Sequence, residues 1–174
     1  MIVDYQNDFN PGGALAVPGG DEVAARINEL AASGHFGLVV ATRDWHPPGH
    51  SSFAAQGGPW PDHCVQDTPG AEFHPALDRS RIDAEILKGL RSGSDGYSGF
   101  EDTELASLLR ERQVDAVTIV GLATDYCVKN TALDALREGF RVEIREDAVR
   151  GVELEPGDSE RALEEMRARG AVTH

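Results

Sequence analysis

The chain has 174 residues, of which 40% are hydrophobic and 26% charged, as expected for one globular domain with its own core. Its formal net charge of −14 comes from acidic residues spread along the chain, with no basic stripe to attract phosphates. The sequence therefore argues against nucleic-acid binding. No apolar run approaches the roughly 18 residues of a membrane span, which argues against insertion into a membrane.

The two cysteines, Cys64 and Cys127, form no CxxC motif and no disulfide framework. Free thiols are typical of a reducing compartment, so the sequence predicts a cytoplasmic protein. No signal peptide precedes the first predicted strand. That strand, Met1–Val3, is shorter than a strand that leads into a motif normally is, and we expect the natural chain to begin further upstream.

Strand-like and helix-like segments alternate along the chain. The strand patterns, rich in β-branched and aliphatic residues, are Met1–Val3, Gly37–Thr42, Ala84–Lys88, Ala116–Val120, Arg141–Arg145 and Ala171–Thr173. The helical patterns are Asp21–Ser33, with Asp21 as its cap and Gly34 as its stop, Asp102–Arg112, Asp125–Glu138 and Gly157–Arg169. This alternation predicts an α/β protein with a mostly parallel sheet and helices on both faces.

Residues 43–82 interrupt this alternation with a stretch rich in Pro, Gly, His and Ser. A loop of this length inside a compact domain is usually functional. Right-handed crossovers bring the carboxyl ends of parallel strands to one edge, where such sheets bind ligands. Asp4, Thr42–Asp44, Lys88 and Gly121–Cys127 lie at or just past strand ends. We therefore expect these four segments to share one site.

Cys127 is the candidate nucleophile, because the first turn of a helix favours a thiolate. The backbone N–H groups of Ala123 and Cys127 are candidates for holding a developing oxyanion. Asp4 could take the thiol proton and deliver it to a leaving group, and Lys88 could keep Asp4 ionised and stabilise the thiolate. The structural alternatives are a small buried thiol at Cys127 and a solvated or purely structural Lys–Asp pair.

The long loop carries a second constellation: Asp44, His46 and His50 in DWHPPGH, then His63 in WPDHC. Imidazole together with carboxylate oxygen suits Zn²⁺ or Fe²⁺. The alternative is a polar loop that merely contains histidines, which the clustering of three of the six histidines beside an aspartate disfavours. Cys64, next to His63, is either a soft ligand or a structural thiol.

Five segments, in this order, carry a resemblance to a known family. They are VDYQNDF with GGALAV (3–17), ATRDWHPPGHSSF (41–53), WPDHCVQDTPGAEFHP (60–75), KG with GYSGF (88–100) and GLATDYCVKNTALDA (121–135). Together they span nearly the whole chain. The sequence resembles the nicotinamidase branch of the isochorismatase-like cysteine hydrolases.

The resemblance implies a three-layer αβα fold around a mostly parallel six-stranded sheet. It implies one domain over residues 1–174, with a metal-binding loop insertion at about 43–82. It also implies a catalytic triad of Asp4, Lys88 and Cys127, in agreement with the roles that strand ends suggest.

For the metal, the resemblance implies Asp44, His46 and His63 as ligands of one divalent ion. Zn²⁺ and Fe²⁺ are the expected ions, with Mn²⁺ as a further option. His50 stands where family members vary between histidine, another residue and water, and we include it in the predicted ligand set.

The resemblance further implies a substrate pocket lined by Phe9, Trp60, Tyr97, Leu122 and Ala123. The Leu122–Ala123 peptide bond is expected to be cis, shaping the oxyanion hole of Ala123 and Cys127. Tyr126 stands where some family members carry histidine, a difference that affects the pocket but no required role.

The implied reaction is hydrolysis of nicotinamide to nicotinate and ammonia through a cysteine thioester. The metal ion would orient the pyridine ring, and pyrazinamide should also fit. The expected partner is this small-molecule substrate, with no nucleic acid and no membrane, and self-association into a homo-oligomer is left open.

Three alternatives stay open at this stage. The first is a hydrolase of the same superfamily for another small amide, carbamoyl or ureido compound, or an isochorismatase, although such relatives generally lack the Asp44, His46 and His63 set. The second is a non-catalytic metal-binding scaffold, against which the complete Asp4, Lys88 and Cys127 trio argues. The third is a hydrolase that uses a metal-bound hydroxide and leaves Cys127 idle.

Overall fold

The computed structural model describes residues 1–174 and is built around one six-stranded sheet of order β3-β2-β1-β4-β5-β6. All neighbouring strands pair in parallel. The strands are β1 (Ile2–Val3), β2 (Val40–Asp44), β3 (Ala84–Lys88), β4 (Ala116–Leu122), β5 (Arg141–Arg150) and β6 (Val172–Thr173). The predicted α/β class with a parallel sheet is confirmed, and all six expected strands are present.

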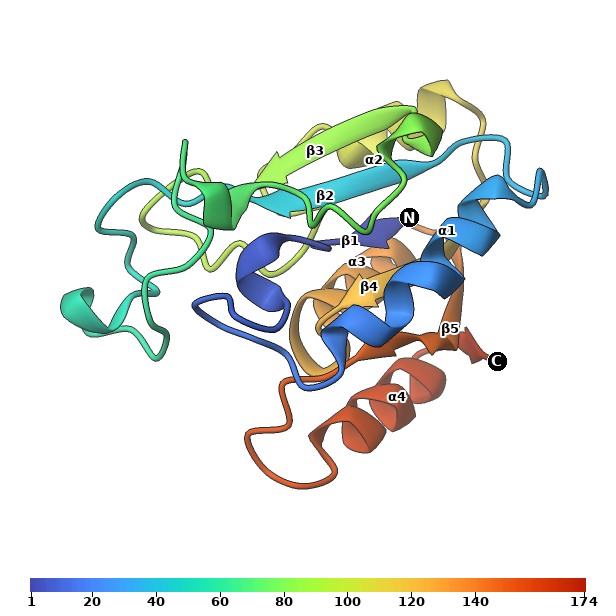
Figure 1. The fold of residues 1–174 in the computed structure, drawn as a ribbon. Helices are drawn as coiled ribbons and strands as arrows, with labels where there is room; N and C mark the ends of the chain where they lie inside the picture. Colours follow the sequence, from blue (N-terminus) through green and yellow to red (C-terminus); the bar gives the residue numbers. More distant parts are fainter.

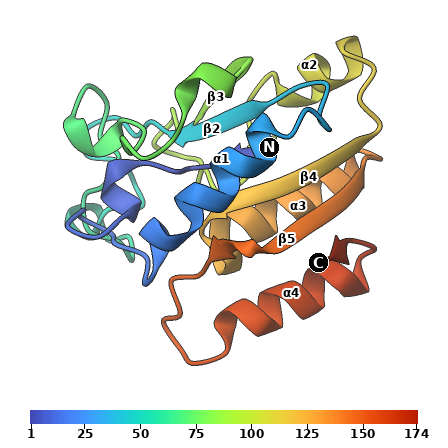
Figure 2. The same ribbon diagram turned by 45° about the vertical axis from the view of Figure 1, so that its right-hand side comes forward.

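Four α-helices cover the two faces of the sheet (Figure 1). They are α1 (Ala24–Ala32), α2 (Leu105–Glu111), α3 (Lys129–Arg137) and α4 (Asp158–Ala168). One hydrophobic cluster joins α1 to one face, and a second cluster joins α2, α3 and α4 to the other. Figure 2 shows α1 in front of β4 and α3 behind it. The three-layer arrangement is thus confirmed, and none of the four helices could span a membrane.

Several predicted boundaries need correction. The first helix begins with a 3₁₀ turn, Gly20–Val23, so that α1 starts at Ala24 and Asp21 caps nothing. The second helix starts three residues later than predicted, because Asp102 has a φ of 54° and the Leu105 N–H donates to Thr103 Oγ1 instead. Strand β5 runs five residues beyond its predicted end at Arg145, since its pairing with β4 resumes after a bulge.

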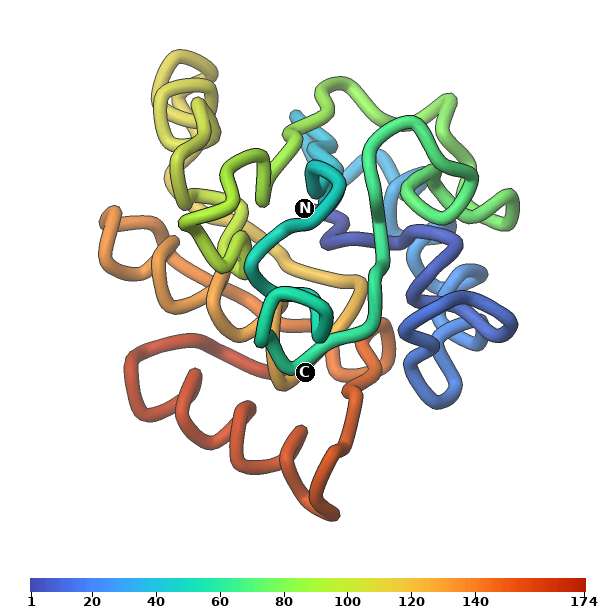
Figure 3. Tube along the Cα trace, turned by 90° about the vertical axis from the view of Figure 1, so that its left-hand side faces the viewer, coloured from blue at the N-terminus to red at the C-terminus, as the bar shows by residue number.

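The segment between β2 and β3 contains only short 3₁₀ turns, at Ala54–Gln56, Pro69–Ala71 and Arg79–Arg81. Isolated bridges pair His46 with Val65 and Phe53 with Trp60, which fold the segment back on itself. Figure 3 looks onto the carboxyl edge of the sheet and shows this segment, cyan to green, running across it. The long loop therefore covers the edge at which parallel sheets bind ligands.

Candidate active site

The three side chains predicted to be catalytic meet at the carboxyl edge of the sheet. Asp4 follows β1, Lys88 ends β3, and Cys127 lies in the turn after β4. The Lys88 Nζ atom lies 2.7 Å from Asp4 Oδ2 and 3.5 Å from Cys127 Sγ. The exposed fractions of Asp4, Lys88 and Cys127 are only 0%, 1% and 6%. Three strand ends, far apart in sequence, thus place a thiol, an amine and a carboxyl group in mutual contact.

Lys88 also joins this trio to the predicted metal ligands. Its Nζ lies 2.5 Å from Asp44 Oδ1 and 2.7 Å from the carbonyl oxygen of Gly96. An ammonium group has three N–H donors, which here go to Asp44 Oδ1, the Gly96 carbonyl oxygen and Cys127 Sγ, while Asp4 pairs with the charge. The hydrogen bond that Lys88 Nζ donates to Cys127 Sγ is long, at 3.5 Å, and the positive charge favours a thiolate there.

Burial and charge set the protonation of this cluster. Burial raises the pKa of the Cys127 thiol well above its usual value, against the opposing effect of Lys88. Burial likewise raises the pKa of Asp4. Burial acts against ionisation of Asp44, but the Lys88 ammonium and His46 outweigh it and lower the pKa of Asp44. Burial thus favours the neutral thiol at Cys127 and makes Asp4 more basic, which is the pairing that proton transfer from sulfur to Asp4 requires.

The turn that carries Cys127 is a π-helical turn, Thr124–Val128, rather than the start of the regular helix predicted from Asp125. The expected cis peptide bond between Leu122 and Ala123 is present. The N–H groups of Tyr126 and Val128 both donate to the Ala123 carbonyl oxygen, which closes the turn tightly around Cys127. Helix α3 begins only at Lys129.

A pocket opens beside Cys127. Phe9, Trp60, Tyr97 and Ala123, all predicted for the pocket, line it together with Leu15, Tyr126, Val152, Asp44, His63 and Cys127. The Trp60 Nε1–H donates to the Tyr97 hydroxyl at 2.9 Å, and the Trp60 and Tyr126 rings pack edge to face. Leu122 does not line this pocket: its side chain is fully buried in the core beneath the turn.

Asp44, His46 and His63 form a compact set of ligand atoms. One ligand atom from each lies within 4.8 Å of the others, and all three residues are buried. The Nδ1 atoms of His46 and His63 lie 3.1 and 2.8 Å from the carbonyl oxygens of Gly89 and Pro61. Because a carbonyl only accepts, each Nδ1 carries a hydrogen, which leaves Nε2 as the ring nitrogen that a metal ion can use. Such backbone support is typical of metal-binding histidines, so the residues present fit a divalent ion.

His50 lies against this set but outside it. Its Nδ1 is 2.8 Å from Ser52 Oγ and its Nε2 is 3.0 Å from the Arg91 carbonyl oxygen. Its ring stacks on that of His46 with centroids 4.2 Å apart. Both ring nitrogens of His50 are thus engaged with the protein, which favours support of His46 over direct ligation.

Two buried residues that the sequence did not single out shape the predicted metal-binding site, one through its side chain and one through the lack of a side chain. The Gln6 carboxamide donates to the Asp44 carbonyl oxygen and accepts from the Asp44 N–H, each at 2.8 Å. Its second donor hydrogen reaches the Ala71 carbonyl oxygen. Gly89 is required next to Lys88, because its φ is 67° and a Cβ atom would overlap the His46 ring. For both residues, the position within a motif is the only feature of the sequence that could have pointed to these roles.

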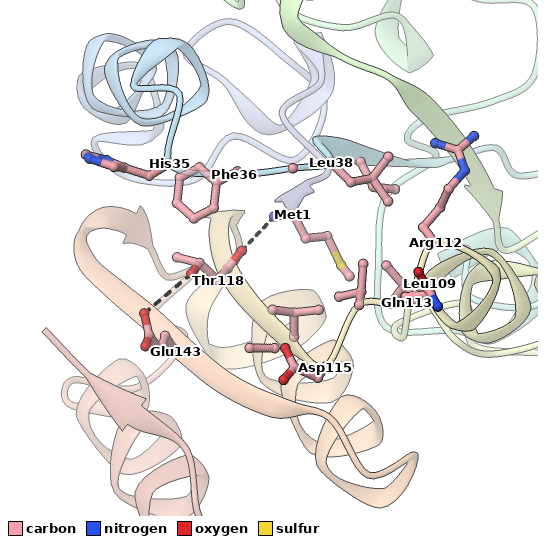
Figure 4. A pocket seen from close by; sticks show the side chains of 15 residues that line it. Met1, His35, Phe36, Leu38, Leu109, Arg112, Gln113, Asp115, Thr118 and Glu143 are labelled. Atoms are coloured by element: carbon pink, nitrogen blue, oxygen red, sulfur yellow. Dashed lines mark hydrogen bonds between the residues drawn. The ribbon is translucent and has the colours of Figure 1, made fainter.

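A cavity larger than the pocket beside Cys127 lies elsewhere. It measures about 480 Å³ and is lined by Met1, Phe36, Leu38, Leu109, Asp115 and Thr118, among others (Figure 4). These residues lie at the amino ends of the strands, the edge of the sheet opposite to Cys127. None of the predicted catalytic, pocket or metal-binding residues lines this cavity. Its size therefore says nothing about the chemistry at the carboxyl edge.

The fold and the site together define a class of α/β hydrolases with a cysteine beside a Lys–Asp pair and an adjacent metal-ligand set. The isochorismatase domain family matches residues 1–174. The chain therefore belongs to the isochorismatase family.

Relatives with a named activity are similar to this chain over nearly its whole length. The nicotinamidase of Escherichia coli is 43% identical over 198 residues, covering 100% of this chain and 92% of the relative. The pyrazinamidase of Pyrococcus horikoshii, solved in complex with zinc, is 51% identical with a TM-score of 0.92 and covers 99% of this chain and 96% of its own. PnC1 from L. infantum, solved with nicotinate, is 40% identical with a TM-score of 0.95, covering 99% and 89%.

Proposed function

We propose that this protein hydrolyses nicotinamide to nicotinate and ammonia, with Cys127 as the nucleophile. The observation that carries the proposal is the meeting of Cys127, Lys88 and Asp4 at the floor of an aromatic pocket that Asp44 and His63 also line. A planar aromatic amide suits such walls. The similarity to nicotinamidases along the whole chain supports the same substrate.

The chemistry follows from the positions of the protein groups. Asp4 takes the thiol proton of Cys127, and Lys88 stabilises the resulting sulfur anion. The sulfur attacks the carboxamide carbon, while the N–H groups of Ala123 and Cys127 hold the oxygen on which negative charge develops. Asp4 returns its proton to the nitrogen as the carbon–nitrogen bond breaks, and ammonia leaves. Water then cleaves the thioester, releases nicotinate and restores the thiol.

Asp44, His46 and His63 would hold a divalent ion at the wall of the pocket. Such an ion supplies a Lewis-acid contact for the pyridine nitrogen and thereby orients the ring. The zinc complex of the P. horikoshii relative supports a divalent metal at this site. Zn²⁺, Fe²⁺ and Mn²⁺ are the candidate ions. Pyrazinamide is expected as a second substrate. A cytoplasmic location, suggested by the two free cysteines, is part of the proposal.

The test is release of nicotinate and ammonia from nicotinamide by the purified protein. The protein is assayed as isolated, after removal of metal with a chelator, and after restoration with each of the three ions. We expect turnover that is lost on chelation and regained with at least one ion, and pyrazinamide to be hydrolysed as well. Absence of release under all conditions would contradict the proposed substrate, and a panel of small linear amides would then locate another one.

A further inference from the structure

Asp125 lies two residues before Cys127 in the same π-helical turn, and its carboxylate is hydrogen-bonded to the loop after β5. Its side chain is buried, with an exposed fraction of 7%. Its Oδ1 accepts the Val152 N–H and its Oδ2 accepts the Glu153 N–H, each at 2.9 Å. Hydrogen bonds to an ionised acceptor are about twice as strong as neutral ones. The turn that bears Cys127 is therefore tied to the loop that follows β5.

That loop forms part of the pocket wall. Val152 lines the same pocket as Cys127 and packs against the core cluster that contains Phe9 and Ala123. The next residue, Glu153, has a φ of 55°, a left-handed conformation that is uncommon for a residue with a side chain. The two hydrogen bonds that Asp125 accepts hold the backbone in this conformation and so fix the position of the Val152 side chain.

The loop is anchored at its other end as well. The Glu153 carboxylate accepts the N–H groups of Gly157 and Ser159 at the start of α4, each at 2.8 Å. Gly151 allows the close approach on the near side, because a Cβ atom there would overlap Ser159 Oγ and stand 3.1 Å from Asp125 Oδ1. Glu153 is thus bound to the start of α4. Between this loop and the turn Thr124–Val128, Asp125 is the residue whose side chain makes hydrogen bonds.

We propose that Asp125 is a positioning residue for substrate binding, which holds Val152 against the substrate ring as one wall of the pocket. It acts through Val152 and does not touch the reacting atoms. Loss of Asp125 leaves Cys127, Lys88 and Asp4 in contact through their own interactions but releases the wall. The affinity for the substrate falls as a result, while the chemical step is retained.

The experiment, which rests on the proposed function, measures kcat and KM for nicotinamide. For Asp125→Ala we expect KM to rise about tenfold with kcat within about twofold of the wild type. For Asp125→Asn, whose single carboxamide oxygen can accept one of the two N–H groups, we expect a smaller rise. Val152→Ala should raise KM in the same direction, and the double variant with Asp125→Ala should be no worse than the worse single variant, because both remove the same wall.

Asp83→Ala is the matched control, since Asp83 Oδ2 accepts the Val39 N–H at 2.7 Å at the far edge of the sheet. It should change neither constant. The proposal is overturned if Asp125→Ala lowers kcat and leaves KM unchanged, or if the KM effects of Asp125→Ala and Val152→Ala multiply in the double variant. Equal KM shifts for Asp83→Ala and Asp125→Ala would likewise overturn it.

Amide hydrogen exchange in Asp125→Asn gives a second readout that needs no activity and a milder substitution than alanine. Faster exchange than in the wild type is expected for at least one of the Val152 and Glu153 amides, because the carboxamide of the variant can accept only one of the two N–H groups. If the wild type releases no nicotinate, the proposed function fails, and the amide exchange rates alone then test the role of Asp125. Unchanged protection of both amides would overturn the proposed role of Asp125.

Discussion

Replacing Lys88 by Met removes the charge at the centre of the site and keeps a side chain of similar length. The ammonium of Lys88 contacts the carboxylates of Asp4 and Asp44, and all three groups are buried. The substitution therefore leaves two carboxylates close together without their shared counter-charge. Breaking a buried ion pair in this way costs about 3–5 kcal/mol of the free energy of unfolding at neutral pH.

The loss should depend on pH with a definite sign. Without Lys88, burial and mutual repulsion raise the pKa values of Asp4 and Asp44 above those of the unfolded chain. The folded variant then binds more protons than the unfolded one, so its free energy of unfolding falls as pH rises. Between about pH 5 and pH 7, each carboxyl group that stays protonated when folded changes the stability by about 1.4 kcal/mol per pH unit. For one such group, the deficit relative to wild type should thus shrink by about 2–3 kcal/mol on going from pH 7 to pH 5.

The measurement is urea unfolding of wild type and Lys88→Met with a chelator present, followed by tryptophan fluorescence at pH 5, 6 and 7. Lys129→Met is the control, because Lys129 forms only a partly exposed pair with Glu165 at 3.7 Å and should cost less than about 1 kcal/mol. A deficit for Lys88→Met below about 1 kcal/mol at pH 7, or one equal at pH 5 and pH 7, would refute the reasoning.

Three further outcomes are expected. Cys127→Ala should lower turnover at least about 1,000-fold with metal content unchanged by elemental analysis; retained turnover would move the chemistry to the metal-bound water. Asp44→Ala should weaken metal affinity more than about 100-fold in a competition titration with a chromophoric chelator, and wild-type affinity would exclude Asp44 as a ligand. Because burial raises the pKa of Cys127, its alkylation by iodoacetamide in metal-free protein should accelerate about tenfold per pH unit from pH 6 to pH 8; a rate independent of pH would indicate a thiolate at rest.

The parallel sheet could be predicted because buried parallel strands carry runs such as Val39–Thr42 and Val117–Val120, which alternate with amphipathic helices. The end of β5 could not, since its second half, EDAVR, has no continuous apolar run and forms a strand only because β4 lies beside it. The π-helical turn at Thr124–Val128 could not be predicted either, because its sequence is equally compatible with the first turn of a regular α-helix.

The site was predicted as two constellations, one catalytic and one metal-binding, and the structure joins them. Asp44 and Lys88 are paired residues on the neighbouring strands β2 and β3, which places the Lys88 ammonium between the proposed ligand Asp44 and the proposed base Asp4. The pairing of Asp44 with Lys88 depends on how β2 and β3 align, and neither segment alone shows it. The same holds for Val152, which reaches the pocket from a loop without any motif and depends on its contacts with Asp125 to stand there.

His50 illustrates a different limit. Its spacing within DWHPPGH is as suitable for a ligand as that of His46, and only the contacts of its ring nitrogens with Ser52 and Arg91 distinguish the two. Residue type and spacing can select candidates for a metal site, but the direction of each imidazole is decided by the backbone around it.

The central claim is that the sulfur of Cys127 becomes covalently attached to the acyl group of nicotinamide. Rapid acid quenching during turnover, followed by mass spectrometry of the digested protein, tests it directly. We expect a nicotinoyl group on the peptide that contains Cys127, removable by hydroxylamine and absent from Cys127→Ala. Steady-state turnover with the group on another residue, or undiminished turnover by Cys127→Ala, would contradict the account.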